Sequence, residues 1–357
     1  MINITVLTFV DRISSFYSLA PFFSNRDKRF RFTFTADPQW CLNRDKNSVL
    51  IMVRQFIKPD HVDLSLMEQL RGKYKRIAFF HDDAGGGIPR LEVLPFVDLF
   101  YSKALFKDRK VYERPLYGKE LYSDYYHTRY GVSDPDSKER IAVQDSAQLN
   151  KLRLSWNIGI GDYPRRQNIQ RMGVVCARLF GPASARFFRG STAFDPDKAV
   201  DSNQGIWPVH ARIGLISRPS ISFQRKLILD KINGNPLFLY GPVSQAQFNR
   251  EVAHSRVVLS PFGWGELCLR DFETVRSGAL LLKPDMAHLE TWPDVFIPHE
   301  TYLPFDWDVE TLVDVAGVIL SDEQKRKRIA KNAAYRYNEA LDVLEERFVS
   351  IMEEIAP

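Results

Sequence analysis

The stretch SPFGWGELCLRDFETVRSGALLLKPD, at residues 260–285, says more about the fold than any other part of the sequence. A run typical of a buried strand, residues 256–260, leads into a loop punctuated by two glycines. A short helical pattern follows at 273–278, and residues 279–282 form a second apolar run. Strand, loop, helix and strand in this order predict one βα unit of a parallel sheet.

Similar patterns recur on both sides of this stretch. Further strands are expected at 4–9, 49–53, 76–80, 97–101, 211–217 and 236–240, and further helices at 62–72 (ending at Gly72), 101–110, 222–233, 245–255, 308–320 and 322–355. The alternation predicts an α/β protein with two doubly wound, Rossmann-like domains facing a cleft.

The expected domain boundaries follow from the same patterns. Residues 1–205 form an N-terminal domain with an irregular insertion, since 118–205 mixes strand and turn signals. Residues 206–321 form a second domain, and helices at 322–357 pack back towards the first.

Composition places the chain among ordinary globular proteins. Of its 357 residues, 45% are hydrophobic and 26% are charged, and the formal net charge is +5. Three cysteines without a CxxC spacing argue against a disulfide framework and a zinc site, which favours a reducing compartment. No signal peptide or membrane-spanning stretch is evident, so we expect a cytoplasmic protein, with peripheral contact to the inner face of the membrane left open.

The loop within 260–285 has the residue types of an anion site. Gly263 and Gly265 allow the backbone to approach a ligand closely, and the backbone N–H groups beside a helix N-terminus favour phosphate. Arg270 could add a bidentate bond to phosphate, and Glu273 could accept hydrogen bonds from a ribose diol. The alternative is an ordinary turn, bordered by a surface ion-pair cluster within 266–271.

The same features resemble the donor-binding segment of GT-B glycosyltransferases, including the exostosin-like and group 1-like enzymes. Phe262-Gly263 matches their glycine loop, and ETVRSG at 273–278 matches their glutamate-to-glycine helix. The resemblance, which covers about 210–320, implies that Glu273 binds the ribose of a nucleotide sugar. Glu266 and Glu273 are one residue closer together than the glutamate pair of many retaining members, so the role of Glu266 stays open.

The resemblance also implies basic residues that grip the donor diphosphate. Ser217 and Arg218 stand after the expected first strand of the second domain, and Arg225 or Lys226 stands on the next helix. Gly241 would border the base pocket. The alternatives are that Arg225 and Lys226 are solvated charges on a helix surface and that Gly241 marks a plain turn.

A catalytic role falls to the HDDAGGG segment at 81–87, which follows an expected strand. His81, Asp82 and Asp83 are candidates for a general base or for acceptor binding, since adjacent carboxylates raise one another's pKa. The alternative is a helix cap beside a buried histidine. No metal is expected, and the D-x-D match at 134–136 is treated as chance.

The resulting hypothesis is a metal-independent glycosyltransferase in bacterial-type surface polysaccharide synthesis, such as O-antigen, capsule or lipopolysaccharide. It would move a sugar from a nucleotide-sugar substrate, with UDP, GDP or CMP left open, to a glycan or lipid-linked glycan acceptor, and it would need no cofactor. One alternative is a CMP-Kdo-type transferase of an acidic sugar. Another is a non-catalytic glycan- or nucleic-acid-binding module, although nucleic acid is not expected because no basic stripe is present.

Overall fold

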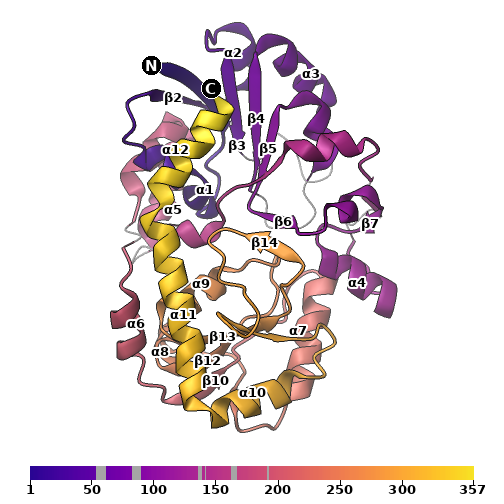
Figure 1. Cartoon of the computed structure of the whole chain (residues 1–357), viewed down its shortest axis with the longest axis vertical. Coiled ribbons are helices and arrows are strands. Elements are labelled where there is room, and N and C mark those ends of the chain that lie inside the picture. Colours follow the sequence, from indigo (N-terminus) through magenta and orange to yellow (C-terminus); the bar gives the residue numbers. More distant parts are fainter. Residues whose placement is uncertain (54–61, 83–89, 136–138, 141, 162–166, 191–192) are drawn as a thin grey trace. The chain divides into compact units, whose positions relative to one another are not determined.

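The computed structural model describes residues 1–357 apart from 54–61, 83–89, 136–138, 141, 162–166 and 191–192. The chain divides into two compact units (Figure 1). Unit 1 comprises Met1–Leu105, Val143–Thr192 and Leu341–Pro357, and unit 2 comprises Phe106–Ala142 and Ala193–Ala340. Each unit is built on a parallel β-sheet.

The sheet of unit 1 has six strands in the order β2-β1-β3-β4-β5-β9, with neighbouring strands parallel. The strands are β1 (Ile2–Thr8), β2 (Phe30–Thr35), β3 (Val49–Val53), β4 (Arg76–His81), β5 (Leu99–Ser102) and β9 (Leu152–Leu154). The predicted strand at 49–53 is β3, and it is buried along its whole length. A strand that is apolar at every position suits a parallel sheet, because helices cover both of its faces.

Helices and short 3-10 turns complete unit 1. They are α1 (Ser14–Ser24), α2 (Pro38–Asn43), α3 (Leu64–Lys73), η1 (Leu91–Phe96), η3 (Ser146–Lys151), η4 (Ile158–Ile160), α5 (Gln167–Phe180), η5 (Pro182–Phe188) and α12 (Leu344–Ile355). The predicted helix at 62–72 is α3, which Asp63 caps. Gly72 was expected to end it, but the helix continues to Lys73 because the Tyr74 N–H still donates back into it.

The sheet of unit 2 has five strands in the order β11-β10-β12-β13-β15, again parallel. The strands are β10 (Trp207–His210), β11 (Phe238–Leu239), β12 (Ser255–Leu259), β13 (Leu280–Pro284) and β15 (Leu303–Phe305). Within β12, Val257 and Leu259 belong to one hydrophobic core while Val258 between them belongs to another. Successive side chains of a strand point to opposite faces, so β12 is covered on both sides.

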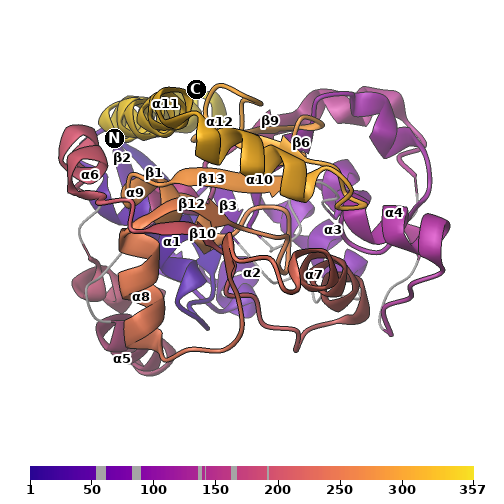
Figure 2. The same ribbon diagram turned by 90° about the horizontal axis from the view of Figure 1, so that it is seen from below.

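The helices of unit 2 contribute side chains to these two cores. They are α4 (Leu121–Tyr130), α6 (Pro196–Ser202), α7 (Pro219–Ile232), α8 (Gln245–Ala253), α9 (Leu269–Arg276), α10 (Leu312–Ser321) and α11 (Glu323–Asp342). Ile228 of α7 and Ala316 of α10 share the core of Val257, whereas Val252 of α8 packs with Val258. Figure 2 shows α8 and α10 on opposite sides of the sheet.

Both strand orders are those of a doubly wound sheet. In each unit the first strand is internal, the second lies at the edge beside it, and the remaining strands follow on the other side. The predicted α/β class with two doubly wound, Rossmann-like sheets is therefore confirmed.

The division of the chain differs from the predicted boundaries. Residues 106–142 and 193–205, which were expected in the N-terminal domain, are counted with unit 2, as is most of α11. Within 106–142 lie η2 (Arg109–Glu113), β7 (Leu116–Tyr117), β8 (Glu139–Arg140) and α4. The segment belongs to unit 2 because its polar side chains bond to α7 and to the loop after β12.

Two predicted elements were wrong. Residues 101–110 are not helical: they contain β6 (Ala104–Phe106), whose residues are all buried, and the start of η2. Residues 211–217 are not a strand, since β10 ends at His210, the last residue paired with both of its neighbours. Beyond it the chain turns outward, and Ile216 is fully exposed. Strands β2, β9 and β15 of the two sheets were not predicted, and neither was β14 (Leu289–Thr291).

Candidate active site

The carboxyl ends of β10 and β12 lie at the same edge of the unit 2 sheet, because the two strands are adjacent and parallel. Open α/β sheets bind ligands at this edge. The chain leaves β10 through residues 211–218 and leaves β12 through residues 260–268. A cavity of about 170 Å³ lies here, lined by Ile213, Gly214, Arg225, Ser260, Pro261, Cys268 and Arg270.

Arg225 reaches this cavity from α7. Its Nη1 donates to the Gly214 carbonyl oxygen at 2.7 Å. Its Nε is buried and has no hydrogen-bond partner among the described residues. Burial lowers the pKa of the Arg225 guanidinium, since desolvation penalises its charge.

Arg270 reaches the cavity from the first turn of α9. Its Nη2 donates to the Arg212 carbonyl oxygen at 3.0 Å, and its guanidinium lies 5.2 Å from the ring centroid of Phe248. Burial lowers the pKa of Arg270, and the positive charge of Arg225 adds to this effect. Neither arginine forms an ion pair with a carboxylate in the described part of the chain. The lining therefore carries two positive charges that attract an anion.

The start of α9 is held by buried polar groups. The Asp271 carboxylate accepts a hydrogen bond from the Cys268 N–H at 2.9 Å, which completes a capping box. It also accepts from Ser260 Oγ at 2.6 Å and from Lys283 Nζ at 3.1 Å. Asp271 and Lys283 are both fully buried. Lys283 was not predicted to have a role, although a lysine within an apolar strand is itself a signal, because a buried charge needs a partner.

The glycine loop packs closely against the helix start. Gly263 N–H donates to the Gly265 carbonyl oxygen at 3.0 Å. A Cβ atom at Gly263 would lie 3.1 Å from Cys268 Sγ, so one of the two side chains would have to shift by a few tenths of an ångström. Between the two glycines, the Trp264 side chain is 65% exposed.

The two glutamates of this region differ in burial. Glu266 is fully buried, whereas Glu273 is exposed and its carboxylate forms no hydrogen bond with the described residues. Glu273 was expected at the start of the helix, but α9 begins at Leu269, so Glu273 lies in its second turn. The surrounding protein still raises the pKa of Glu273, and the nearby Arg270 opposes this.

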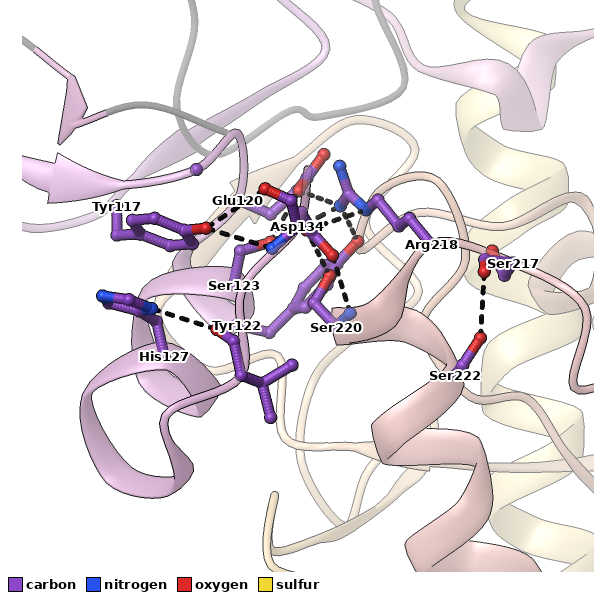
Figure 3. Close-up of polar contacts among 12 residues, drawn as sticks. Tyr117, Glu120, Tyr122, Ser123, His127, Asp134, Ser217, Arg218, Ser220 and Ser222 are labelled. Atoms are coloured by element: carbon purple, nitrogen blue, oxygen red, sulfur yellow. Dashed lines mark hydrogen bonds and ion pairs between the residues drawn. The ribbon is translucent and has the colours of Figure 1, made fainter. Parts of the chain in front are cut away.

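Arg218 does not line the cavity, since its guanidinium is enclosed by side chains from 106–142 (Figure 3). It forms ion pairs with Glu120 and, through Nε at 3.5 Å, with Asp134. Asp134 also accepts from the Ser220 N–H at 2.8 Å and from Ser220 Oγ at 2.7 Å. The N-terminus of α7 therefore has a carboxylate partner in Asp134, as that of α9 has in Asp271.

The other predicted donor-binding residues are also placed. Lys226 is exposed on α7 and pairs with Asp230 at 2.5 Å, away from the cavity lining. The Ser217 carbonyl oxygen accepts from Ser222 Oγ at 3.1 Å. Gly241 has a φ of +88°, which fits a turn after β11. The structure thus brings together Arg270 and Arg225, together with the loop that carries Gly263.

The predicted catalytic residues lie in unit 1. His81 is the last residue of β4; it is buried and its ring stacks on Phe100 with centroids 6.0 Å apart. Asp82 accepts a hydrogen bond from Ser18 Oγ. Asp83 lies outside the described residues.

Two further features of the structure concern metal ligands and membrane-length helices. Over the described ranges, no group of three or more His, Cys, Asp or Glu side chains is placed to hold a metal ion. Over the same ranges, no helix combines the length and the apolarity that crossing a bilayer requires.

Comparison with known proteins gives structural likenesses only. No family model matches the sequence, and no curated protein matches it. Among solved structures, HepE from Anabaena in complex with UDP and glucose is 8% identical, with a TM-score of 0.47 over 99% of this chain and 100% of that chain.

Two further solved structures have similar sequence identities and TM-scores. An alpha-glucosyltransferase in complex with UDP-glucose and DNA containing an abasic site is 11% identical, with a TM-score of 0.42 over 98% of this chain and 99% of that one. A UDP-forming alpha,alpha-trehalose-phosphate synthase from Burkholderia vietnamiensis is 16% identical, with a TM-score of 0.41 over 86% and 75%. With each TM-score below 0.5, the fold class rests on the strand orders and not on these likenesses.

Proposed function

We propose that the protein is a nucleotide-sugar glycosyltransferase of the GT-B type and that the cavity of unit 2 binds the donor diphosphate. The observation that carries this proposal is the pair of arginines, Arg225 and Arg270, which line a cavity at the carboxyl ends of β10 and β12 without carboxylate partners in the described chain. Arginine forks bind phosphate oxygens bidentately, and a partly desolvated site strengthens such bonds.

The same groups suit the chemistry of the leaving group. As the sugar is transferred, negative charge grows on the departing phosphate, and fixed positive charges stabilise it. Arg225 and Arg270 would supply that charge, so we propose that transfer is metal-independent. Glu273, whose carboxylate is exposed near Arg270, would bind the ribose hydroxyls.

The acceptor side of the proposal concerns unit 1. We propose that His81 or Asp82 serves the acceptor hydroxyl as a base or as a binding group, because both lie at the carboxyl end of β4 in a doubly wound sheet. We further propose a glycan or lipid-linked glycan acceptor in surface polysaccharide synthesis at the cytoplasmic side of a membrane. That context rests on the resemblance of residues 210–320 alone.

A second donor chemistry fits the same lining. Two guanidinium groups could bind the single phosphate of a CMP-linked sugar and the carboxylate of an acidic sugar. The number of charges does not distinguish this from a diphosphate, so the nucleotide itself must be identified.

The test is a thermal-unfolding series with UDP, GDP, dTDP, ADP and CMP. One nucleotide, at about 100 times its Kd, should stabilise the wild type by roughly 2.7 kcal/mol. Arg225→Gln and Glu273→Ala should lose most of that gain. Lys226→Gln is the matched control, because it removes a neighbouring positive charge that lies outside the cavity lining. If no nucleotide stabilises the wild type, or if Lys226→Gln behaves like Arg225→Gln, the proposal is wrong.

A further inference from the structure

The segment 106–142 contacts two consecutive residues of the loop after β12, and Arg218, which it encloses, lies near a third. The Tyr122 ring stacks on Phe262 with centroids 4.9 Å apart and planes inclined by 25°. The Tyr122 hydroxyl donates to the Gly263 carbonyl oxygen at 2.8 Å. Arg218, which this segment encloses, lies 6.0 Å from the Trp264 ring centroid.

These contacts form a directed chain of hydrogen bonds. Arg218 Nη2 donates to the Tyr122 hydroxyl oxygen at 2.5 Å, and the hydroxyl then donates to Gly263. Burial raises the pKa of Tyr122 well above its ordinary value, so the hydroxyl keeps its proton as a donor. Donors in series polarise one another, which strengthens the bond that reaches the loop.

A second contact holds Phe262, the loop residue that precedes Gly263. Gln224 of α7 accepts from the Phe262 N–H through Oε1 at 2.8 Å and donates to the Tyr126 hydroxyl through Nε2 at 2.9 Å. Tyr122 and Tyr126 are four residues apart on α4 and therefore lie on one helix face. The loop is thus held by α4 directly at Gly263 and, through Gln224 of α7, at Phe262.

We propose that Tyr122 and Arg218 are positioning residues: by holding residues 262–265 they fix Pro261 and Cys268, which flank that stretch and line the cavity for the donor phosphates. Arg218 acts through Tyr122 and does not itself grip the donor. This inference rests on the proposed function and assigns segment 106–142 to the donor site. Holding the loop before the donor arrives lowers the ordering cost of binding.

The experiment compares Tyr122→Phe with Tyr125→Phe in the full chain. Each change removes one tyrosine hydroxyl from α4, but the Tyr125 hydroxyl bonds to Asp308 at 2.7 Å rather than to the loop. Hydrogen exchange of the amides of residues 262–265 should quicken in Tyr122→Phe and stay at the wild-type rate in Tyr125→Phe. Amides of β12 and β13 should be unchanged in both, which separates loosening of the loop from general destabilisation.

The second readout uses the nucleotide that stabilises the wild type. Tyr122→Phe should weaken its binding roughly fivefold, the equivalent of one lost hydrogen bond, and should raise the KM for the donor more than it changes kcat. Tyr125→Phe should leave both quantities unchanged. Gln224→Met, which removes the second contact, should quicken exchange at Phe262 and provides an independent test if Tyr122→Phe does not fold.

The two proposals fail differently. Unchanged exchange at 262–265 in both Tyr122→Phe and Gln224→Met would overturn the positioning role, whether or not a nucleotide binds. Unchanged donor affinity in Tyr122→Phe would overturn it as well. Absence of nucleotide binding by the wild type would instead overturn the proposed function, and the exchange data would then show only that segment 106–142 orders the loop.

Discussion

At the scale of single residues, Glu120 is a carboxylate in surroundings that favour its protonated form. Burial raises the pKa of Glu120 from 4.5 to about 7; Arg218 opposes this shift and Glu266 adds to it. The native state therefore binds the proton more tightly than the unfolded chain does. The contribution of protonated Glu120 to the free energy of unfolding is complete below pH 4.5 and is lost as the pH rises to about 7.

Glu120→Gln should remove this pH dependence. The free energy of unfolding of the wild type, minus that of the variant, should fall between pH 5 and pH 8 by at most about 3 kcal/mol. Urea unfolding at several pH values measures it. Glu113→Gln, at an exposed glutamate of the same segment, should show no such trend. A difference that is flat or that rises with pH would contradict the prediction.

The ion pair of Asp271 and Lys283 is a second buried charge pair. Asp271→Asn leaves the fully buried ammonium of Lys283 without its counter-charge, so unfolding should become easier by about 3–5 kcal/mol. Asp230→Asn breaks the exposed pair with Lys226 and should cost less than about 1 kcal/mol. Equal effects in a denaturant titration would show that burial does not decide the cost.

The arginines of this region show how much of the candidate site could be predicted from residue types alone. Arg270 was predicted as a phosphate ligand from its place after the glycine loop, and it does line the cavity. Arg218 and Arg225 were indistinguishable from the sequence, since both are basic residues near the same expected strand. What separates them is the pair of carboxylates, Glu120 and Asp134, that segment 106–142 brings to Arg218, and this long-range contact leaves no periodic signal.

At the scale of elements, α7 and α9 are each followed closely by a glycine with positive φ. Gly234 has a φ of +74° and Gly278 a φ of +70°. A Cβ at Gly278 would lie 2.4 Å from the Ala199 carbonyl oxygen, whereas nothing lies within 4 Å of one at Gly234. Both positions favour glycine because of their positive φ, but only Gly278 also lacks space for a Cβ atom.

Substituting alanine at both positions separates the two costs. Gly234→Ala should lower stability by about 1–2 kcal/mol, the cost of a left-handed backbone for a residue with a Cβ. Gly278→Ala should cost clearly more, because the backbone of α6 would have to move. Thermal unfolding measures both, and equal losses would mean that α6 gives way freely.

Elements were predicted best where they are buried on both faces, because such strands need an unbroken run of apolar residues. The strands at 49–53 and 76–80 were found nearly to the residue, as β3 and β4. The start of α9 was missed because Leu269 and Arg270 read equally well as loop. The run 211–217 was mistaken for a strand because an apolar loop beside a cavity has the same composition as a buried strand.

At the scale of the whole molecule, the last segment of the chain completes the first unit. Helix α12 carries four buried side chains, those of Phe348, Ile351, Met352 and Ile355, and residues 341–357 are counted with unit 1. Burial of these apolar groups contributes several kcal/mol to the core of that unit.

A chain that ends at Ala340 should therefore lose the protection of unit 1. Hydrogen exchange should become fast in β1, β3 and β4, while β12 and β13 of unit 2 keep their protection. A chain that ends at Ile355, which retains all of α12, is the control and should match the full chain. Retained protection of β3 and β4 in the shorter chain would show that α12 is dispensable to unit 1.

The interleaving of the two units has a consequence for synthesis on the ribosome. The chain passes from one unit to the other after Leu105, Ala142, Thr192 and Ala340. Unit 1 begins to emerge before unit 2, but it cannot be completed until α12 leaves the exit tunnel, when every residue of unit 2 has already been made. The apolar strands of unit 1 must therefore wait for α12 without aggregating, and no single cut in the gene separates the two units.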